Sequence, residues 1–264
     1  MDLQLQEKTA FITGATAGIG FATAQSLARE GARIILNGRA EEKLNRSIRK
    51  LQQACPEASI SGLAADFSKP NEVRALLEKL PAIDILINNV GMYESGSFFE
   101  EGEEDWYRQF EVNVMSGVRL SKELLPKMLS NNWGRILFIS SECATLVPVN
   151  LIPYSMTKAA VLSVSRGLAQ LTKGSGVTVN TVVPGSTLSE GAELFLENTA
   201  KKEGKTKAQV EEAFFTEVRT SSLLQRFAKV EEVANTITYL TSPLSSATNG
   251  VAIKVDGGSM GGII

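Results

Sequence analysis

The chain has 264 residues, of which 43% are hydrophobic and 21% are charged, and its net charge is −2. This composition fits one large globular domain, and the near-neutral charge gives no reason to expect binding to nucleic acid or to an anionic membrane. The sequence has no histidine, which excludes Ser-His-Asp catalysis, Cys-His catalysis and histidine-ligated zinc.

The first predicted strand leads directly into a glycine-rich turn. Residues 9–13 form a short apolar run, and three glycines follow in a G-x-x-x-G-x-G spacing before a helical pattern that lasts to residue 30. Glycines let the backbone approach a pyrophosphate, and the helix amino terminus presents N–H groups and a positive dipole end. The turn therefore predicts a dinucleotide site with the contact residues Gly14, Thr16, Gly18, Ile19 and Gly20.

The second predicted strand, residues 33–37, bears on the choice of cofactor. In NAD-binding folds an acidic residue usually ends this strand and binds the ribose 2′-hydroxyl. Here Asn37 ends the strand and Arg39 follows two positions later, where it is placed to pair with a 2′-phosphate. Asn37 and Arg39 are therefore expected to contact the cofactor, and NADP(H) is favoured over NAD(H). The alternative is that Arg39 is a solvated arginine at the start of the next helix.

Helices and strands alternate over the next 50 or so residues. The pattern predicts a charged amphipathic helix over residues 40–54, a strand over 60–64, a helix over 70–80 and a strand over 84–88. This alternation predicts an α/β fold, a doubly wound parallel sheet of the Rossmann type with helices on both faces. Because no linker or internal repeat is present, residues 1–264 are expected to form a single domain.

An acidic cluster precedes the next predicted helix, which covers residues 110–129. The loop expected over residues 92–106 contains five acidic residues, Glu100, Glu101, Glu103, Glu104 and Asp105. Negative charge is favourable at the amino end of a helix, so the cluster is expected to cap this helix, and no metal site is expected. Asn113 stands among apolar residues and is either a buried hydrogen-bonding group or a surface residue.

The strand predicted over residues 135–139 leads to the residues with the clearest chemistry. It runs into Ser141, and a helix that carries Tyr154 and Lys158 is expected after Pro153. Tyr154 and Lys158 are four positions apart and therefore share one helix face. An ammonium beside a phenol lowers the phenol's pKa, so Tyr154 is expected to exchange protons near neutral pH. Taken alone, the pair also fits an exposed tyrosine and a solvated lysine.

The alternation breaks in the last third of the chain. A strand is predicted over residues 177–183, after which residues 188–226 have the pattern of a long, charged helical insertion. Insertions after the carboxyl end of a strand commonly cover active sites and carry specificity. A helix over residues 230–241 and a strand over 251–255 complete the predicted sheet.

Together these motifs resemble those of the short-chain dehydrogenase/reductase family over essentially the whole chain. The matching residues are Gly14-x-x-x-Gly18-x-Gly20, Asn88-Asn89-Val90-Gly91, Asn113, Ser141, Tyr154-x-x-x-Lys158 and Pro184-Gly185. Each motif is weak alone. Their order and spacing, including the 13 positions from Ser141 to Tyr154, identify the chain as similar to this family.

The resemblance implies catalytic roles for Asn113, Ser141, Tyr154 and Lys158. Tyr154 would be the general acid in ketone reduction and the general base in alcohol oxidation. Lys158 would lower the pKa of Tyr154 and hold the nicotinamide ribose. Ser141 would hydrogen-bond the substrate oxygen, and Asn113 would hold a water that links Lys158 to solvent. The cofactor would supply the hydride, and the protein would supply position and the proton.

The resemblance also implies contacts along the cofactor. From the adenine to the carboxamide, the implied contact residues are Asp66, Phe67, Asn88, Gly91, Pro184, Gly185, Thr187 and Ser189. Glu142 and Cys143 are expected to line the substrate pocket. Cys143 is expected to form part of the pocket wall rather than act as a nucleophile, because no histidine is present to activate it. A further set is expected to form either an apolar pocket wall or ordinary core: Met92, Tyr93, Phe195, Phe214, Phe215 and Met260.

The residues therefore predict an NADP(H)-dependent oxidoreductase that acts on a ketone or a secondary alcohol. Two alternatives stay open: an NAD-dependent alcohol dehydrogenase of the same family, and a dinucleotide-binding regulator without turnover. The resemblance implies a homo-oligomer, a dimer or a tetramer. Two cysteines are too few for a disulfide framework, and no signal-peptide pattern or membrane-length apolar run is present, so a cytoplasmic location is expected.

Overall fold

A seven-stranded sheet forms the centre of the computed structural model, which describes residues 2–262. The strand order is β3-β2-β1-β4-β5-β6-β9, and every neighbouring pair is parallel. In chain order the strands are β1 (Thr9–Ile12), β2 (Arg33–Gly38), β3 (Ile60–Ala64), β4 (Ile85–Asn88), β5 (Gly134–Ile139), β6 (Val177–Pro184) and β9 (Ala252–Val255). The predicted doubly wound parallel sheet is confirmed.

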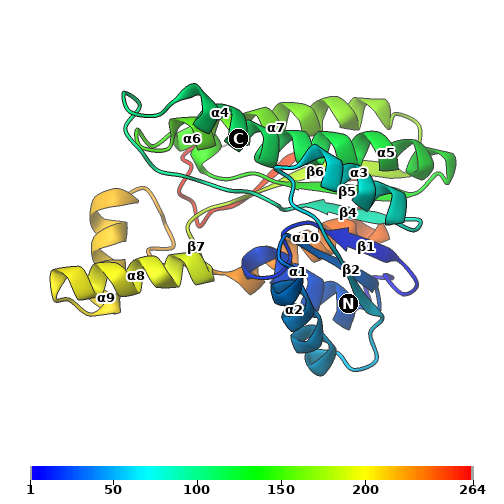
Figure 1. Ribbon diagram of the computed structural model, residues 1–264, viewed down its shortest axis with the longest axis horizontal. Coiled ribbons are helices and arrows are strands. Elements are labelled where there is room, and N and C mark those ends of the chain that lie inside the picture. The colour runs from blue at the N-terminus through cyan, green and yellow to red at the C-terminus, as the bar shows by residue number, and fades with distance from the viewer. Residues whose placement is uncertain (1, 263–264) are drawn as a thin grey trace.

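Helices cover both faces of this sheet (Figure 1). One face carries α1 (Gly18–Arg29), α2 (Glu41–Ala54) and α10 (Val230–Thr241). The other carries α3 (Pro70–Lys79), α4 (Glu103–Phe110), α5 (Ser116–Ser130) and α7 (Ile152–Leu171). A hydrophobic cluster fills each side, with Leu27 and Ile237 in the first and Leu124 and Val161 in the second. The fold is therefore three layered, with one core on each side of the sheet.

The central strands are buried on both faces because helices cover both faces. All six residues of β5 and all eight of β6 are buried. The ends of the observed strands differ from the predicted ends by at most one residue. These strands fix a common edge, formed by their carboxyl ends, at which the loops after β1, β4, β5 and β6 meet.

The helix expected from residue 110 begins earlier, at Glu103. The α4 helix continues through a π-helical turn, η1 (Glu111–Met115), into α5. The expected acidic cap is confirmed at this earlier start, where Asp105 accepts a hydrogen bond from the Gly102 amide at 3.2 Å. The predicted start was late because Gly102 and the charges around it resemble a loop more than a first helical turn.

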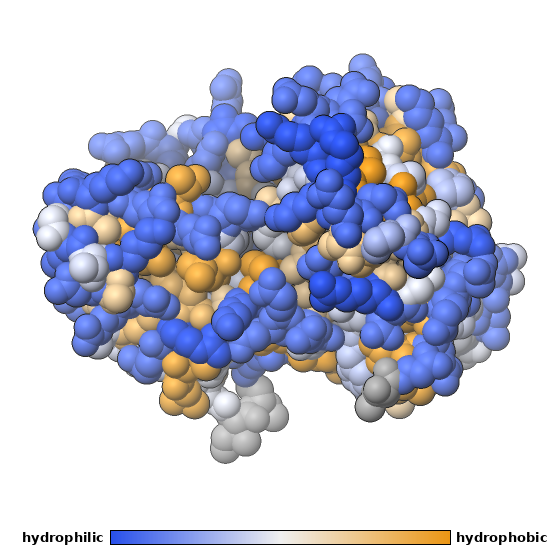
Figure 2. Space-filling model, turned by 90° about the horizontal axis from the view of Figure 1, so that it is seen from below, coloured by the Kyte–Doolittle hydropathy of each residue, from blue (hydrophilic) through white to orange (hydrophobic). Residues whose placement is uncertain are grey.

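The insertion, residues 188–226, projects from one side of the sheet (Figure 1). It contains α8 (Glu190–Glu203), α9 (Lys207–Ala213) and a second π-helical turn, η2 (Phe214–Val218), and two short parallel strands close its base, β7 (Thr187–Leu188) and β8 (Ala228–Lys229). A hydrophobic cluster around Phe215 and Phe227 forms a small core there. Seen from below, hydrophobic side chains gather among charged ones over this unit (Figure 2).

Two short helices complete the chain, α6 (Cys143–Leu146) after the loop that follows β5, and the 3-10 turn η3 (Pro243–Ser245) after α10. Among residues 2–262, no helix is both long enough and apolar enough to cross a membrane.

Candidate active site

A cavity of about 550 Å³ lies at the carboxyl ends of β5 and β6. The loop after β5 contributes Ser141, and the first turns of α7 contribute Tyr154 and Lys158. The insertion contributes Phe195 and Phe214 to the opposite wall. This catalytic cavity therefore lies where doubly wound folds bind their ligands, and the insertion forms part of its wall.

The amino end of α7 brings Tyr154 and Lys158 together. Pro153 is in the first turn, where its fixed φ suits a helix start. Lys158 Nζ lies 5.6 Å from the centroid of the Tyr154 ring and donates a hydrogen bond to the Ile139 carbonyl at 2.9 Å. The Lys158 side chain is 4% exposed. The helix thus anchors a buried ammonium at the end of β5, near the Tyr154 ring.

Burial favours the neutral form of both groups. Desolvation lowers the pKa of Lys158 to about 8. Desolvation raises the pKa of the Tyr154 phenol above its ordinary value, and a hydrogen bond with the Ser141 hydroxyl opposes that rise. This direction is opposite to the lowered Tyr154 pKa expected from the sequence, because desolvation is the largest effect on the phenol. Tyr154 therefore holds its proton at neutral pH, as a proton donor must.

The two serines after β5 have separate functions. Ser140 is buried, and its hydroxyl donates a hydrogen bond to the Lys158 carbonyl at 2.8 Å, which fastens the loop to α7. The Ser141 oxygen accepts a hydrogen bond from the Cys143 amide at 3.2 Å. The loop therefore fixes the Ser141 oxygen in the cavity while leaving its hydroxyl proton available for donation.

Asn113 lies in the π-helical turn η1 and is 6% exposed. Its Oδ1 accepts from the Met92 amide at 2.8 Å, and its Nδ2 donates to the Met92 carbonyl and to the Thr157 hydroxyl, both at 2.9 Å. The Thr157 hydroxyl in turn donates to the Tyr154 carbonyl at 2.7 Å. Of the two readings of Asn113, the buried hydrogen-bonding group is confirmed. Its amide ties the loop after β4 to the first turns of α7.

The glycine turn has the backbone geometry that a pyrophosphate needs. Gly14 and Gly18 have φ values of +60° and +57°, a region that favours glycine. A Cβ on Gly20 would lie 2.5 Å from Asn89 Nδ2. The N-cap residue of α1 is Ala17, whose methyl group cannot cap the helix, so the first N–H groups remain available. The turn therefore has the free N–H groups and the glycine backbone that a dinucleotide phosphate would require.

Asn37 braces this turn from the end of β2. Its side chain is 1% exposed, with Oδ1 accepting from the Gly14 amide at 3.2 Å and Nδ2 donating to the Leu63 carbonyl at 3.1 Å. Because these bonds occupy the amide on the protein's own backbone, Asn37 supports the glycine turn from beneath.

Arg39 and Asp66 lie near each other on the rim at the ends of β2 and β3. Burial acts to raise the pKa of Asp66, but hydrogen bonds from Ser68 and the charges of Lys69 and Arg39 outweigh it and hold the pKa below its ordinary value. Arg39 is exposed, and its guanidinium is accessible to a ligand. Phe67 is 2% exposed and packs in the core, so its side chain supports the rim from within.

Asn88 and Asn89 face opposite sides, as neighbouring residues at a strand end do. A Cβ on Gly117 would lie 3.3 Å from Asn88 Cγ, so the Asn88 side chain packs against α5. Asn89 lines the cavity, and its Nδ2 donates to the Thr13 and Gly14 carbonyls at 2.9 and 3.0 Å. Asn89 was missing from the predicted site, although strand alternation distinguishes the two asparagines.

The structure divides the predicted site residues into two groups. The lining of the catalytic cavity includes Ile19, Gly91, Ser141, Tyr154, Lys158, Pro184, Gly185, Thr187 and Ser189. The predicted residues that do not line it are Gly14, Thr16, Gly18, Gly20, Asn37, Arg39, Asp66, Phe67, Asn88 and Asn113.

Some of the residues expected in the wall of the substrate pocket also line the cavity. Glu142 and Cys143 line the cavity, as do Met92, Tyr93, Phe195 and Phe214. Phe215 and Met260 are buried and lie outside this lining. The sequence did not single out Ser186 and Arg219, which also line it.

Comparison with known proteins gives a consistent result. Residues 8–203 match the family described as short chain dehydrogenase. The chain is 48% identical over 261 residues to the uncharacterized oxidoreductase YvrD, and 46% identical over 258 residues to the uncharacterized oxidoreductase YvaG, both of Bacillus subtilis (strain 168). Both alignments cover 98% of this chain and 98% of the relative.

A solved structure of similar shape extends this comparison. The L-sorbose reductase from Gluconobacter frateurii, complexed with NADPH and L-sorbose, has a TM-score of 0.93 and 30% sequence identity to this chain. The match covers 100% of both chains.

Proposed function

Because the chain belongs to the short-chain dehydrogenase family, we propose that it is an NADP(H)-dependent oxidoreductase that transfers a hydride between nicotinamide and a ketone or secondary alcohol. The observation that carries this proposal is that Ser141, Tyr154 and Lys158 line one cavity next to the glycine turn. The turn supplies a place for the cofactor, and the three side chains supply the groups that proton transfer needs.

The cofactor supplies the hydride when bound, and the protein's own groups position the substrate and move the proton. Ser141 donates a hydrogen bond to the substrate oxygen, which holds the carbonyl beside Tyr154. Tyr154 gives its proton to that oxygen in reduction and takes it back in oxidation. Lys158 places a positive charge below the phenol, which stabilises the phenolate that proton donation leaves. Asn113 holds the loop that follows β4 against the first turns of α7, which keeps these groups in position.

Arg39 supports NADP(H) over NAD(H) in this proposal. It is exposed at the end of β2, where NAD-binding folds usually carry an acidic residue. Its guanidinium pairs well with a phosphate, and the similar L-sorbose reductase is described in complex with NADPH. Asp66 lies close enough to Arg39 for their charges to interact, which weakens the attraction of Arg39 for a 2′-phosphate and keeps the alternative of an NAD-dependent enzyme open.

A screen of carbonyl compounds tests the proposal directly. Purified protein is mixed with NADPH and, in separate reactions, L-sorbose, simple ketones, steroids and acyl thioesters, and loss of reduced nicotinamide is followed by absorbance. Turnover of at least one ketone is expected, faster with NADPH than with NADH. Tight NADPH binding without turnover of any compound would contradict the proposal and favour the alternative of a dinucleotide-binding regulator.

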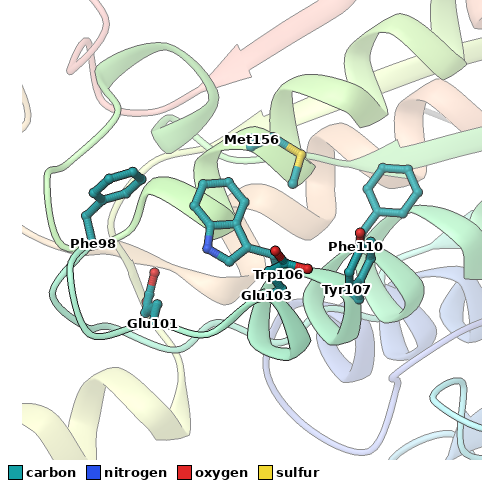
Figure 3. Close-up of a pocket in the computed structure, with 7 residues that line it drawn as sticks. All are labelled: Phe98, Glu101, Glu103, Trp106, Tyr107, Phe110 and Met156. Carbon is teal, nitrogen blue, oxygen red and sulfur yellow. The ribbon is translucent and has the colours of Figure 1, made fainter.

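We also propose that the protein is a cytoplasmic homo-oligomer, a dimer or tetramer. An apolar groove of about 620 Å³ lies between α4 and α7, with Phe98, Trp106, Phe110 and Met156 on its walls (Figure 3). Tyr107 is 70% exposed beside it. Contiguous exposed aromatic groups of this kind favour contact with another protein surface. A second copy of this chain, packed through α4, α5 and α7, would bury them.

A further inference from the structure

The catalytic cavity contains one ion pair that the proposed proton transfer does not use. Arg219 Nε donates a hydrogen bond to Glu142 Oε1 at 2.8 Å, and the Ser186 hydroxyl donates to the same oxygen at 3.0 Å. The two charged side chains are 14% and 4% exposed, and all three residues line the cavity. The pair is therefore shielded from bulk solvent, in contrast to an ordinary surface ion pair.

This ion pair lies directly beside the proposed substrate-binding hydroxyl. Glu142 follows Ser141 in the chain, and Arg219 Nη2 lies 4.0 Å from the sulfur of Cys143. The Cys143 amide donates a hydrogen bond to the Ser141 oxygen at 3.2 Å. The guanidinium is therefore close to the place where the reacting carbonyl would be held.

The orientation of the Arg219 guanidinium is fixed, but some of its N–H groups form no hydrogen bond within the part of the chain that the structure describes. The Arg219 amide donates to the Phe214 carbonyl at 2.8 Å, and the guanidinium carbon lies 5.9 Å from the centroid of the Phe214 ring. Glu142 occupies Nε. Within residues 2–262, Nη1 has no hydrogen-bond partner and Nη2 has only the long sulfur contact. Because arginine has donors and no acceptor, its free N–H groups are able to bind an acceptor oxygen of a substrate in the cavity.

The charges around this acceptor position favour a neutral group. Glu142 already balances the charge of Arg219, so an anionic substrate would add a second negative charge close to the Glu142 carboxylate. A hydroxyl or carbonyl oxygen accepts from the guanidinium without that repulsion. Beyond Arg219 the cavity wall contains the aromatic side chains Phe195, Phe214 and Phe227, which suit an apolar remainder of the substrate.

We propose that Arg219, held in position by Glu142, determines substrate specificity by binding an oxygen next to the reacting carbonyl. The substrate class is a neutral ketone that carries a hydroxyl or a second carbonyl on the adjacent carbon. This inference rests on the proposed function, because it assigns a substrate class to the same site.

Three matched ketones test the assignment. They are benzylacetone, the analogue in which the methyl group beside the carbonyl is a hydroxymethyl group, and the analogue in which it is a carboxylate. The three share one phenyl-bearing skeleton and differ only where Arg219 would bind. For each, kcat and KM are measured with NADPH, and binding to the protein–NADPH complex is measured by calorimetry.

The variants separate recognition from stability. Arg219→Met alone would leave Glu142 buried without its partner, so the main variant combines Arg219→Met with Glu142→Gln and removes both charges. Arg219→Lys keeps the charge and loses the planar fork. Lys207→Met is the control, since Lys207 forms an ion pair with Glu197 on the exposed side of the same insertion.

The wild-type protein is expected to prefer the hydroxymethyl ketone over both analogues by at least about tenfold in kcat/KM. The double variant should lose about 10- to 100-fold in kcat/KM for the hydroxymethyl ketone, mainly through KM, and little for benzylacetone. Arg219→Lys should be intermediate, and Lys207→Met should match wild type.

Other outcomes separate this inference from the proposed function. Equal turnover of benzylacetone and its hydroxymethyl analogue, unchanged in the double variant, would overturn the inference and leave the proposed function standing. A preference for the carboxylate would also overturn it. If none of the ketones is turned over but calorimetry shows the hydroxymethyl preference and its loss in the double variant, only the proposed function fails.

Discussion

Lys158 is a buried ammonium in the catalytic cavity, and no carboxylate in residues 2–262 is its hydrogen-bond partner. It is 4% exposed, and its ammonium donates to the Ile139 carbonyl, a neutral partner. Burial therefore lowers its pKa to about 8. A group with this pKa is charged below pH 8 and neutral above it, so the charge under the phenol changes within the range of ordinary assays.

This pKa predicts a specific pH dependence of cofactor binding. NADPH is an anion, so it binds more tightly to the charged form of Lys158. Between about pH 7 and pH 8 the dissociation constant should be flat; above pH 8 it should rise by up to about tenfold per pH unit. Because the chain has no histidine, few other side chains titrate there, and the 2′-phosphate of NADPH titrates below this range, at about pH 6. Fluorescence titration of NADPH from pH 7 to 10 measures this, and Lys158→Met should remove the break; a break that survives in the variant would contradict the account.

A second residue-scale prediction concerns Arg39. Arg39→Ala should weaken NADPH binding by about 10- to 100-fold, because it removes a charge-assisted hydrogen bond to the 2′-phosphate. NADH binding should change by less than about threefold. Arg46→Ala is the control, since Arg46 is an exposed arginine on α2 that forms an ion pair with Glu42. Equal losses of affinity for NADPH and NADH would show that Arg39 does not select between the two cofactors.

At the scale of elements, the insertion should behave as a separately stabilised unit. Its hydrophobic cluster includes Phe215, which is 2% exposed and packs at ring distances of 5.1 and 5.2 Å against Phe214 and Phe227. The short β7–β8 pair, contacts across the cavity and hydrogen bonds from the Leu223 and Leu224 amides to the Gly257 carbonyl join this unit to the main sheet, whereas α8 and α9 pack on the cluster itself. The free energy needed to open the insertion should therefore depend on its own core.

Phe215→Ala tests this separation. The truncation should lower the local opening free energy of α8 and α9 by about 3 kcal/mol, because a fully buried phenylalanine is lost. Hydrogen exchange should speed up in the insertion and stay unchanged in β5 and β6. Phe67→Ala is the comparison, because Phe67 is also 2% exposed but lies in the main core. If both variants lose protection from hydrogen exchange throughout the chain, the insertion and the sheet unfold as one cooperative unit, which would contradict this prediction.

The regular elements of this fold could be predicted because their signals are local. The glycine turn follows a strand, and Tyr154 and Lys158 share a helix face through their spacing of four. The π-helical turn at Asn113 could not be predicted from the sequence, because a single turn with one extra residue produces no recognisable pattern. The pairing of Glu142 with Arg219 was also hidden, since 77 residues separate them.

At the scale of the whole molecule, the α4 groove predicts self-association. Phe99 is 93% exposed and Tyr107 is 70% exposed on this side. Sedimentation should therefore show a species larger than the 28.4 kDa chain. Tyr107→Glu should shift the distribution toward the monomer, because it places a charge in the apolar contact. Gln53→Glu on the exposed side of α2 is the control, and a wild-type monomer at micromolar concentration would contradict the proposed oligomer.

Tyr154→Phe tests the central claim most directly, because it removes one hydroxyl from the cavity and leaves the ring in place. The account predicts that kcat for ketone reduction falls by about 100- to 10,000-fold, the usual contribution of a general acid, while the NADPH dissociation constant stays within about twofold. Tyr239→Phe, at an exposed position on α10, should match wild type in both. Ketone reduction at the wild-type rate by Tyr154→Phe would contradict the assignment of Tyr154 as the acid–base group.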